Sequence, residues 1–265
     1  VRALTLLPQA RDNRELNFRP TDRRKTMEKK ELTPEELEEL KQRHIRSFVM
    51  RRGHISNAQK RALEEALPRY AVDYETKLLD FNAAFGREAP VVLEIGCGMG
   101  ETTCAIAAAH PEINFLGCEV FAAGVGALAK RLDEMALTNV RIVRHDAVEV
   151  VRDMIPENFL AGVHIYFPDP WRKARHHKRR LVAQPFIGML VSRIAPGGYI
   201  HCATDWENYS EQMMEVLSAE PKLRNLHEGF SPVMANPLCE RPQTKFQARG
   251  ERLGHGIWDL VFIRQ

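Results

Sequence analysis

Three glycines stand at alternate positions after an apolar run, in the segment Ile95-Gly96-Cys97-Gly98-Met99-Gly100. Glycine lets the backbone turn tightly and lets a ligand lie against bare peptide groups. A helix that starts just after such a loop offers free N–H groups to a carboxylate or a phosphate. The pattern is typical of a loop that binds a dinucleotide or S-adenosylmethionine, and a tight turn without a ligand is the alternative. Glu94, directly before the loop, would oppose a pyrophosphate but suits the cationic amino-acid end of S-adenosylmethionine.

Two further carboxylates fall at the ends of the next two predicted strands. Glu119 comes about twenty residues after the loop, where a carboxylate can accept both hydroxyls of a ribose. Dehydrogenases and methyltransferases share this feature. Asp146 lies where it can meet an adenine edge, and a role as N-cap of the next helix is the alternative.

The segment Phe167-Pro168-Asp169-Pro170-Trp171 encloses one carboxylate between two prolines. Proline restricts φ and has no N–H, so the loop is predicted to be rigid with the carboxylate directed outward. Trp171 could stack on a base or pack against the loop. Residues 172–180 follow at once with six basic residues and no acid. This run predicts contact with a polyanion, and a solvated helix start is the alternative.

The elements that must position these residues alternate along the chain. Apolar runs predict strands at 91–95, 114–120, 140–144, 162–167, 199–203 and 256–263. Helical patterns between and after them predict helices at 101–109, 122–136, 148–154, 180–194 and 207–217. Continuous apolar strands that alternate with helices indicate a doubly wound α/β domain with a parallel sheet. Ligands of such sheets bind beyond the carboxyl ends of the strands, where the residues above are predicted to lie.

Before residue 90 the chain is predicted to hold a weakly ordered basic segment and two short helices that pack against the main domain. Residues 1–30 hold nine Lys and Arg and four Asp and Glu, without helical or strand periodicity. Capping boxes at Thr33-Pro34-Glu35-Glu36 and Ser56-Asn57-Ala58-Gln59 predict helices through 44 and 67, and Pro68 should end the second.

Composition excludes several classes of protein. The 265 residues are 44% hydrophobic, with no apolar run long enough for a membrane span, and no secretory signal is evident. The five cysteines are widely spaced, and neither CxxC nor HExxH occurs, so we expect no disulfide framework and no metal. We expect a cytoplasmic protein.

The motifs occur in an order that resembles one family. Leu93-Glu-Ile-Gly-Cys-Gly-Met-Gly, Phe167-Pro-Asp-Pro-Trp, Arg175-His-His-Lys-Arg-Arg, Ala203-Thr-Asp205 and Thr244-Lys-Phe246 are similar to those of bacterial tRNA (guanine-N7-)-methyltransferases. The resemblance covers about residue 46 to the C-terminus, including Arg46-Ser-Phe-Val-Met-Arg-Arg-Gly-His. It implies a mostly parallel, seven-stranded Rossmann-like sheet over residues 46–265, and residues 1–45 would be a basic extension with a short helix.

The resemblance also implies the activity and the roles of particular residues. The enzyme would transfer a methyl group from S-adenosylmethionine to N7 of guanine 46 in the variable loop of tRNA, leaving S-adenosylhomocysteine. It would be a monomer or a homodimer. Asp169 would be catalytic. The implied cofactor-binding residues are Glu94, Gly96, Gly98, Glu119, Asp146 and Asp169. The implied guanosine-binding residues are Lys173, Asp205, Thr244, Lys245, Phe246 and Gln247. The implied RNA-binding residues are Arg175, His176, His177, Lys178, Arg179 and Arg180.

Three alternatives stay open at this point. A methyltransferase for a small molecule or a protein amine would explain the glycine loop but not the basic run, and a methyltransferase for another RNA belongs to the same class. A nicotinamide-dependent oxidoreductase would favour GxGxxG, whereas Glu101 stands at its last position. A non-catalytic RNA-binding protein would not need the carboxylates. The family usually has glutamate after Thr-Lys-Phe, where this chain has Gln247, an amide that can both donate and accept.

Overall fold

The computed structural model describes residues 45–50, 54–236 and 240–265. All of these described residues belong to one compact unit. The strands are β1 (Val91–Ile95), β2 (Asn114–Cys118), β3 (Val140–Val143), β4 (Leu160–Tyr166), β5 (Ile194–Thr204), β6 (Leu223–Asn225) and β7 (Trp258–Arg264). The helices are α2 (Asn57–Glu65), α3 (Phe81–Phe85), α4 (Glu101–Ala109), α5 (Ala122–Glu134), α6 (Ala147–Asp153), α7 (Phe186–Arg193), α8 (Glu207–Ser218) and α9 (Lys245–Arg252), with 3-10 turns η1 (Leu67–Arg69) and η2 (Ala174–Arg179). The helix predicted at 33–44 lies outside the described residues, and the domain boundary at residue 45 stays a prediction.

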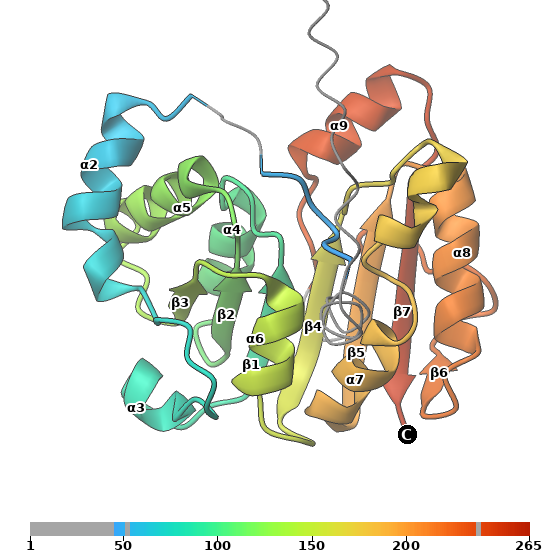
Figure 1. Cartoon of the computed structure of the whole chain (residues 1–265), viewed down its shortest axis with the longest axis horizontal. Helices are drawn as coiled ribbons and strands as arrows, with labels where there is room; N and C mark the ends of the chain where they lie inside the picture. The colour runs from blue at the N-terminus through green and yellow to red at the C-terminus, as the bar shows by residue number, and fades with distance from the viewer. Residues whose placement is uncertain (1–44, 51–53, 237–239) are drawn as a thin grey trace, which may run out of the picture. The chain divides into compact units, whose positions relative to one another are not determined.

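The strands form one sheet in the order β3-β2-β1-β4-β5-β7-β6. Strands β1 to β5 pair in parallel, and β7 runs antiparallel to both β5 and β6. The chain moves outward from β1 through β2 to β3, then returns to the other side of β1 with β4. Such a switch point opens a crevice at the carboxyl ends of the strands. Figure 1 shows this edge of the sheet, with α9 lying across it.

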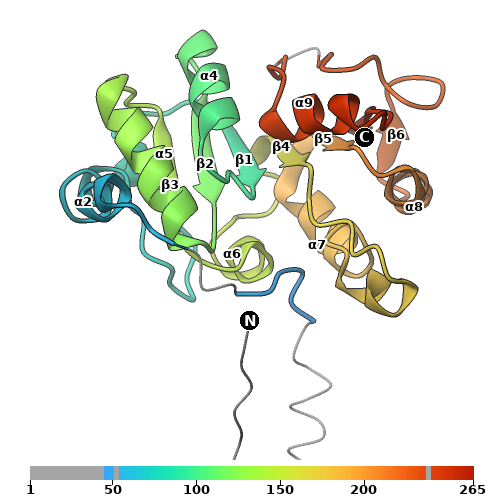
Figure 2. The same cartoon turned by 90° about the horizontal axis from the view of Figure 1, so that it is seen from above.

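Helices cover both faces of the sheet, so the molecule has two cores (Figure 2). One core packs α6, α7 and α8 against residues such as Leu93 and Ile165, and the other packs α2, α4 and α5 against residues such as Val92 and Phe115. Neighbouring residues of β1 therefore point into different cores, which explains why this strand is apolar along its length. None of the described helices is long and apolar enough to cross a membrane.

Most predicted elements are confirmed to within a few residues. The Ser56 capping box is present. The Ser56 hydroxyl accepts from the backbone N–H of Gln59 at 3.2 Å, and Oε1 of Gln59 accepts from the backbone N–H of Ser56 at 2.8 Å. Helix α2 nevertheless ends at Glu65, and Pro68 lies within the 3-10 turn that follows.

The helix predicted at 180–194 is wrong in its first part, because α7 begins only at Phe186. Before it, the backbone N–H of Val182 donates to the hydroxyl of Tyr209 on α8 at 3.1 Å. Pro185 then occupies the N-cap. Elements α3, β6 and α9 were not predicted; they have five, three and eight residues respectively.

Candidate active site at the carboxyl edge of the sheet

The glycine loop after β1 needs glycine for its backbone conformation. Gly96, Gly98 and Gly100 all have positive φ, at +83°, +55° and +78°. A Cβ on Gly100 would stand 2.5 Å from a side-chain carbon of Leu128, whereas a Cβ on Gly96 would meet nothing within 4 Å. The third glycine therefore serves close packing, and the first leaves open space beside the backbone. The loop fits a ligand that lies against its peptide groups.

Glu119 follows β2 and closes the loop from the next strand. One carboxylate oxygen accepts from the N–H of Gly98 at 2.8 Å, and the other accepts from Val120 and Phe121 at 2.8 and 2.9 Å. Three backbone donors thus hold the carboxylate at the mouth of the crevice. Asp146 follows β3 and is the N-cap of α6, accepting from the N–H of Val148 at 3.0 Å.

Glu94 lies within β1, behind the loop, and its side chain is buried. Its Oε2 atom has no hydrogen-bond partner among the residues that the structure describes. Burial raises the pKa of Glu94, the Thr103 hydroxyl opposes this shift and the negative charge of Glu119 adds to it, so that the pKa is about 7. A buried carboxylate without a partner is costly unless a cation or a donor reaches it. The ammonium group of an amino-acid ligand fits this requirement.

The proline-flanked loop after β4 is held in a strained conformation. Phe167 and Trp171, on either side of Pro168-Asp169-Pro170, have positive φ of +51° and +48°, which is uncommon for large side chains. The N–H of Phe167 donates to the carbonyl of Ala203 at 2.7 Å. The indole N–H of Trp171 donates to the carbonyl of Ser47 at 3.0 Å, so Trp171 packs against the chain. Asp169 between them is exposed.

These segments enclose one cavity of about 270 Å³. Six predicted residues line it: Gly96, Gly98, Glu119, Asp146, Asp169 and Phe246. Its other walls are largely apolar and include Phe48, Phe121, Tyr166, Phe167 and Leu181, which were not predicted. Two of these had a signal in the sequence: Phe167 adjoins the proline loop, and Phe48 lies in the segment that begins at Arg46 and is included in the family resemblance. The cavity combines polar groups that suit an amino acid and a ribose with apolar walls that suit a flat ring.

The predicted guanosine-binding residues divide into exposed and buried groups. Phe246 is 60% exposed, and its ring stacks on that of Phe167 with the centroids 6.2 Å apart. Lys245 Nζ lies 2.5 Å from Oε1 of Glu101, an ion pair that joins α9 to α4. Asp205 is partly exposed and lies 3.3 Å from Nδ1 of His255.

Thr244 and Gln247 are buried and serve the helix itself. The Thr244 hydroxyl caps α9 by accepting from the N–H of Gln247 at 3.0 Å. The amide of Gln247 accepts from Arg241 and donates to Glu251. The spacing Thr-x-x-Gln was the signal in the sequence that could have located α9.

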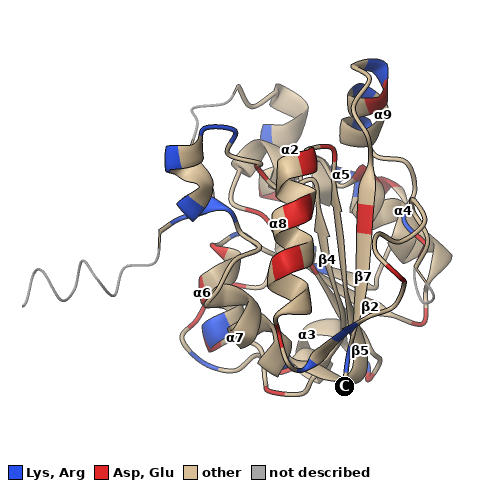
Figure 3. Cartoon of the chain, turned by 90° about the vertical axis from the view of Figure 1, so that its right-hand side faces the viewer, with Lys and Arg blue, Asp and Glu red and all other residues tan. Residues whose placement is uncertain are grey.

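The basic run after the proline loop lies beside α8, whose exposed side carries acidic residues (Figure 3). Lys173, Arg175 and Lys178 are exposed, and Arg179 lies with its guanidinium 5.1 Å from the centroid of the Trp171 ring. The histidines are partly buried: His176 packs edge-on against the Trp171 ring, where burial and the surrounding cations lower its pKa, and His177 lies beside Arg180.

Arg180 departs from its predicted role. Its side chain is buried, donates to the carbonyl of Pro170 at 2.9 Å and to Oδ1 of Asn208 at 2.9 Å, and lies over the ring of Tyr209. It therefore holds the proline loop to α8 and is not available to an RNA phosphate in this structure.

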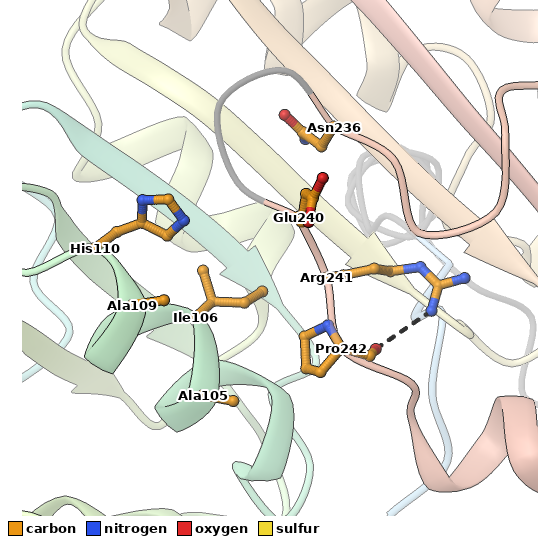
Figure 4. A pocket seen from close by; sticks show the side chains of 8 residues that line it. All are labelled: Ala105, Ile106, Ala109, His110, Asn236, Glu240, Arg241 and Pro242. Carbon is orange, nitrogen blue, oxygen red and sulfur yellow. Dashed lines mark hydrogen bonds between the residues drawn. The ribbon is translucent and has the colours of Figure 1, made fainter.

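A second, larger cavity of about 490 Å³ lies between α4 and the segment that leads to α9 (Figure 4). Its lining includes Ile106, His110, Glu240 and Arg241, and none of the predicted site residues. No group of metal-ligating side chains occurs within residues 45–50, 54–236 and 240–265.

The sheet order, the glycine loop, the acid within β1 and the acids after β2 and β3 define an α/β methyltransferase. A family model described as "Putative methyltransferase" matches residues 88–260. The crystal structure of the 16S rRNA methyltransferase KamB shares the fold, with a TM-score of 0.52 at 15% identity over 74% of this chain and 99% of that one.

Relatives with high sequence identity show which methyltransferase family the chain belongs to. The tRNA (guanine-N(7)-)-methyltransferase of Bordetella pertussis is 62% identical over 221 residues, which cover 83% of this chain and 85% of that protein. The enzyme with the same name from Paraburkholderia xenovorans is 57% identical over 233 residues, 88% of each chain. This chain belongs to the family of tRNA (guanine-N7-)-methyltransferases.

Proposed function

We propose that this protein transfers a methyl group from S-adenosylmethionine to N7 of guanine 46 in the variable loop of tRNA. The observation that carries the proposal is the single cavity in which the glycine loop, Glu119 and Asp146 face the proline-flanked Asp169. The exposed cations beside this cavity favour RNA over a small amine as the methyl acceptor. The absence of a GxGxxG loop and the unpartnered Glu94 oxygen disfavour a dinucleotide.

The cofactor would be held by residues that the chain already orients. Glu94 would pair with its ammonium group, Glu119 would accept from its ribose hydroxyls, and Asp146 would meet its adenine near the start of α6. When bound, S-adenosylmethionine supplies an electrophilic methyl group. S-adenosylhomocysteine would remain as the product.

Guanine N7 carries no hydrogen, so methyl transfer needs no strong base. The chain has to place N7 in line with the methyl group, and positioning of this kind can contribute about 7–11 kcal/mol. Asp169 would orient the guanine and stabilise the positive charge that develops on its ring. The exposed residues Lys173, Lys245 and Phe246 would hold the nucleoside together with the partly exposed Asp205, and Phe246 would offer an aromatic face to the base.

The RNA would be held through its backbone by the exposed part of the basic run. Lys173, Arg175 and Lys178 would contact phosphates, together with the half-buried Arg179. The protein would act in the cytoplasm, where tRNA is found, as a monomer or a homodimer.

The test is to incubate purified protein with S-adenosylmethionine and an unmodified tRNA transcript and to locate 7-methylguanosine by mass spectrometry of nuclease fragments. We expect it at position 46, and a transcript with adenine at that position should stay unmodified. Methylation of a metabolite or protein pool, with none in tRNA, would refute the proposal.

A further inference from the structure

Arg241 is buried although it is charged, and it lies just before the N-cap of α9. Its Nε and Nη2 atoms donate to the two oxygens of Asp259 on β7, at 2.7 and 2.6 Å. Asp259 in turn lies 2.7 Å from Nε2 of His201 on β5. A two-point contact of this kind fixes the plane of the guanidinium, and here it ties Arg241 to two strands of the sheet.

The other side of the guanidinium reaches α9. Its Nη1 atom donates to Oε1 of Gln247 at 2.5 Å. Gln247 is one turn into the helix and next to Phe246, whose ring borders the cofactor cavity. The sheet therefore holds the first turn of α9 through Arg241. Figure 4 shows Arg241 extending away from the second cavity, with Nη1 also directed at the carbonyl of Pro242.

Arg241 also packs on the loop that carries Asp169. Its guanidinium carbon lies 5.5 Å from the ring centroid of Phe167 and 5.8 Å from that of Tyr166. Phe167 has the left-handed backbone conformation that directs the chain into Pro168 and Asp169. A large side chain keeps such a conformation only where its surroundings hold it.

We propose that Arg241, fixed by Asp259, is a positioning residue for methyl transfer. It joins the start of α9 to the loop after β4, and so sets Phe246 and Asp169 relative to each other across the cavity, although Arg241 itself does not line that cavity. It follows that Gln247 acts through Arg241 rather than on the guanosine. The inference rests on the proposed function.

The experiment is a double-mutant cycle on tRNA methylation with R241M, Q247M and the double variant. Both single changes should lower kcat by about ten-fold or more while the Kd for S-adenosylhomocysteine changes little, because alignment is lost and the groups that bind the cofactor remain. The double variant should be no slower than R241M, because residue 247 has nothing left to act through.

R141M is the matched control for a general loss of stability. Arg141 on β3 donates to the carbonyl of Ala84 at 2.6 Å and lies over the ring of Phe85, away from the cavity. All variants are assayed below their unfolding temperatures, and R141M should keep its kcat. The positioning role would be overturned if the double variant lost kcat by the product of the two single losses. It would also be overturned if R141M lost as much kcat as R241M. If R241M does not fold, equal activity of Q247M and wild type would overturn it. Wild-type protein that makes no 7-methylguanosine in tRNA would instead refute the proposed function.

Discussion

The two halves of the carboxyl edge are built in different ways. In the half formed by β1, β2 and β3, acidic side chains are held mainly by nearby backbone N–H groups: Glu119 binds those of Val120 and Phe121, and Asp146 binds that of Val148. These contacts span one or two residues, so a short motif is enough to specify them, and one further bond from the N–H of Gly98 joins Glu119 to the glycine loop. This half is the proposed cofactor site.

In the other half, the contacts come from far along the chain. Trp171 donates to Ser47, Arg180 reaches Asn208, and Arg241 packs on Phe167. The loop that carries Asp169 has two left-handed residues and depends on these distant contacts to keep its shape. The comparison indicates a locally determined cofactor half and a nucleoside half that is assembled by tertiary structure.

D169N is expected to have the largest effect, and to separate the two halves. The substitution removes a negative charge from the cavity, so kcat for tRNA methylation should fall by about 100-fold or more. Binding of S-adenosylhomocysteine should change little, because Glu119 and the glycine loop remain. Calorimetry and single-turnover methylation measure the two quantities, and E211Q on the exposed side of α8 is the control. Near-full activity of D169N would show that Asp169 has no part in the chemistry.

The pH dependence of cofactor binding gives an effect of intermediate size, through Glu94. Its pKa is about 7 in the folded protein and about 4.5 ordinarily, so folding favours the protonated form. Its contribution to stability is full at pH values below about 4.5 and is lost as the pH rises through 7, by at most about 3 kcal/mol. A bound ammonium group reverses this penalty, so S-adenosylhomocysteine should raise Tm more at pH 8 than at pH 6.

E94Q separates the contribution of this carboxyl group from those of the other titratable groups in the protein. In that variant the increase in Tm caused by S-adenosylhomocysteine should be smaller and should be nearly equal at the two pH values. Wild-type protein that already behaves in this way would contradict the assignment of Glu94 to the ammonium group.

The sequence predicted the locally determined cofactor half better than the nucleoside half, which tertiary contacts assemble. The apolar runs predicted β1 and α4 with the observed bounds, and the glycine spacing predicted the loop between them, because both signals are local. Helix α9 was missed because Lys245–Arg252 is almost entirely polar; it depends on its Thr244 cap and on Arg241. The burial of Arg180 and Gln247 could not be predicted, since the residues that enclose them are distant in the sequence or belong to elements that were not predicted.

The basic run offers the smallest expected effect and a comparison within the nucleoside half. Lys178 is exposed, so K178Q should remove one phosphate contact and lower the slope of log K for tRNA against log salt by about one unit, with Tm unchanged. R180Q should leave that slope unchanged, because the side chain is enclosed by Pro170, Asn208 and Tyr209, but should lower stability by about 1–3 kcal/mol through unsatisfied buried groups. Filter-binding titrations between low and moderate salt, together with thermal unfolding, measure both. If R180Q reduced the salt slope as much as K178Q, Arg180 would have to leave its buried position when RNA binds, and the loop would be less rigid than its contacts indicate.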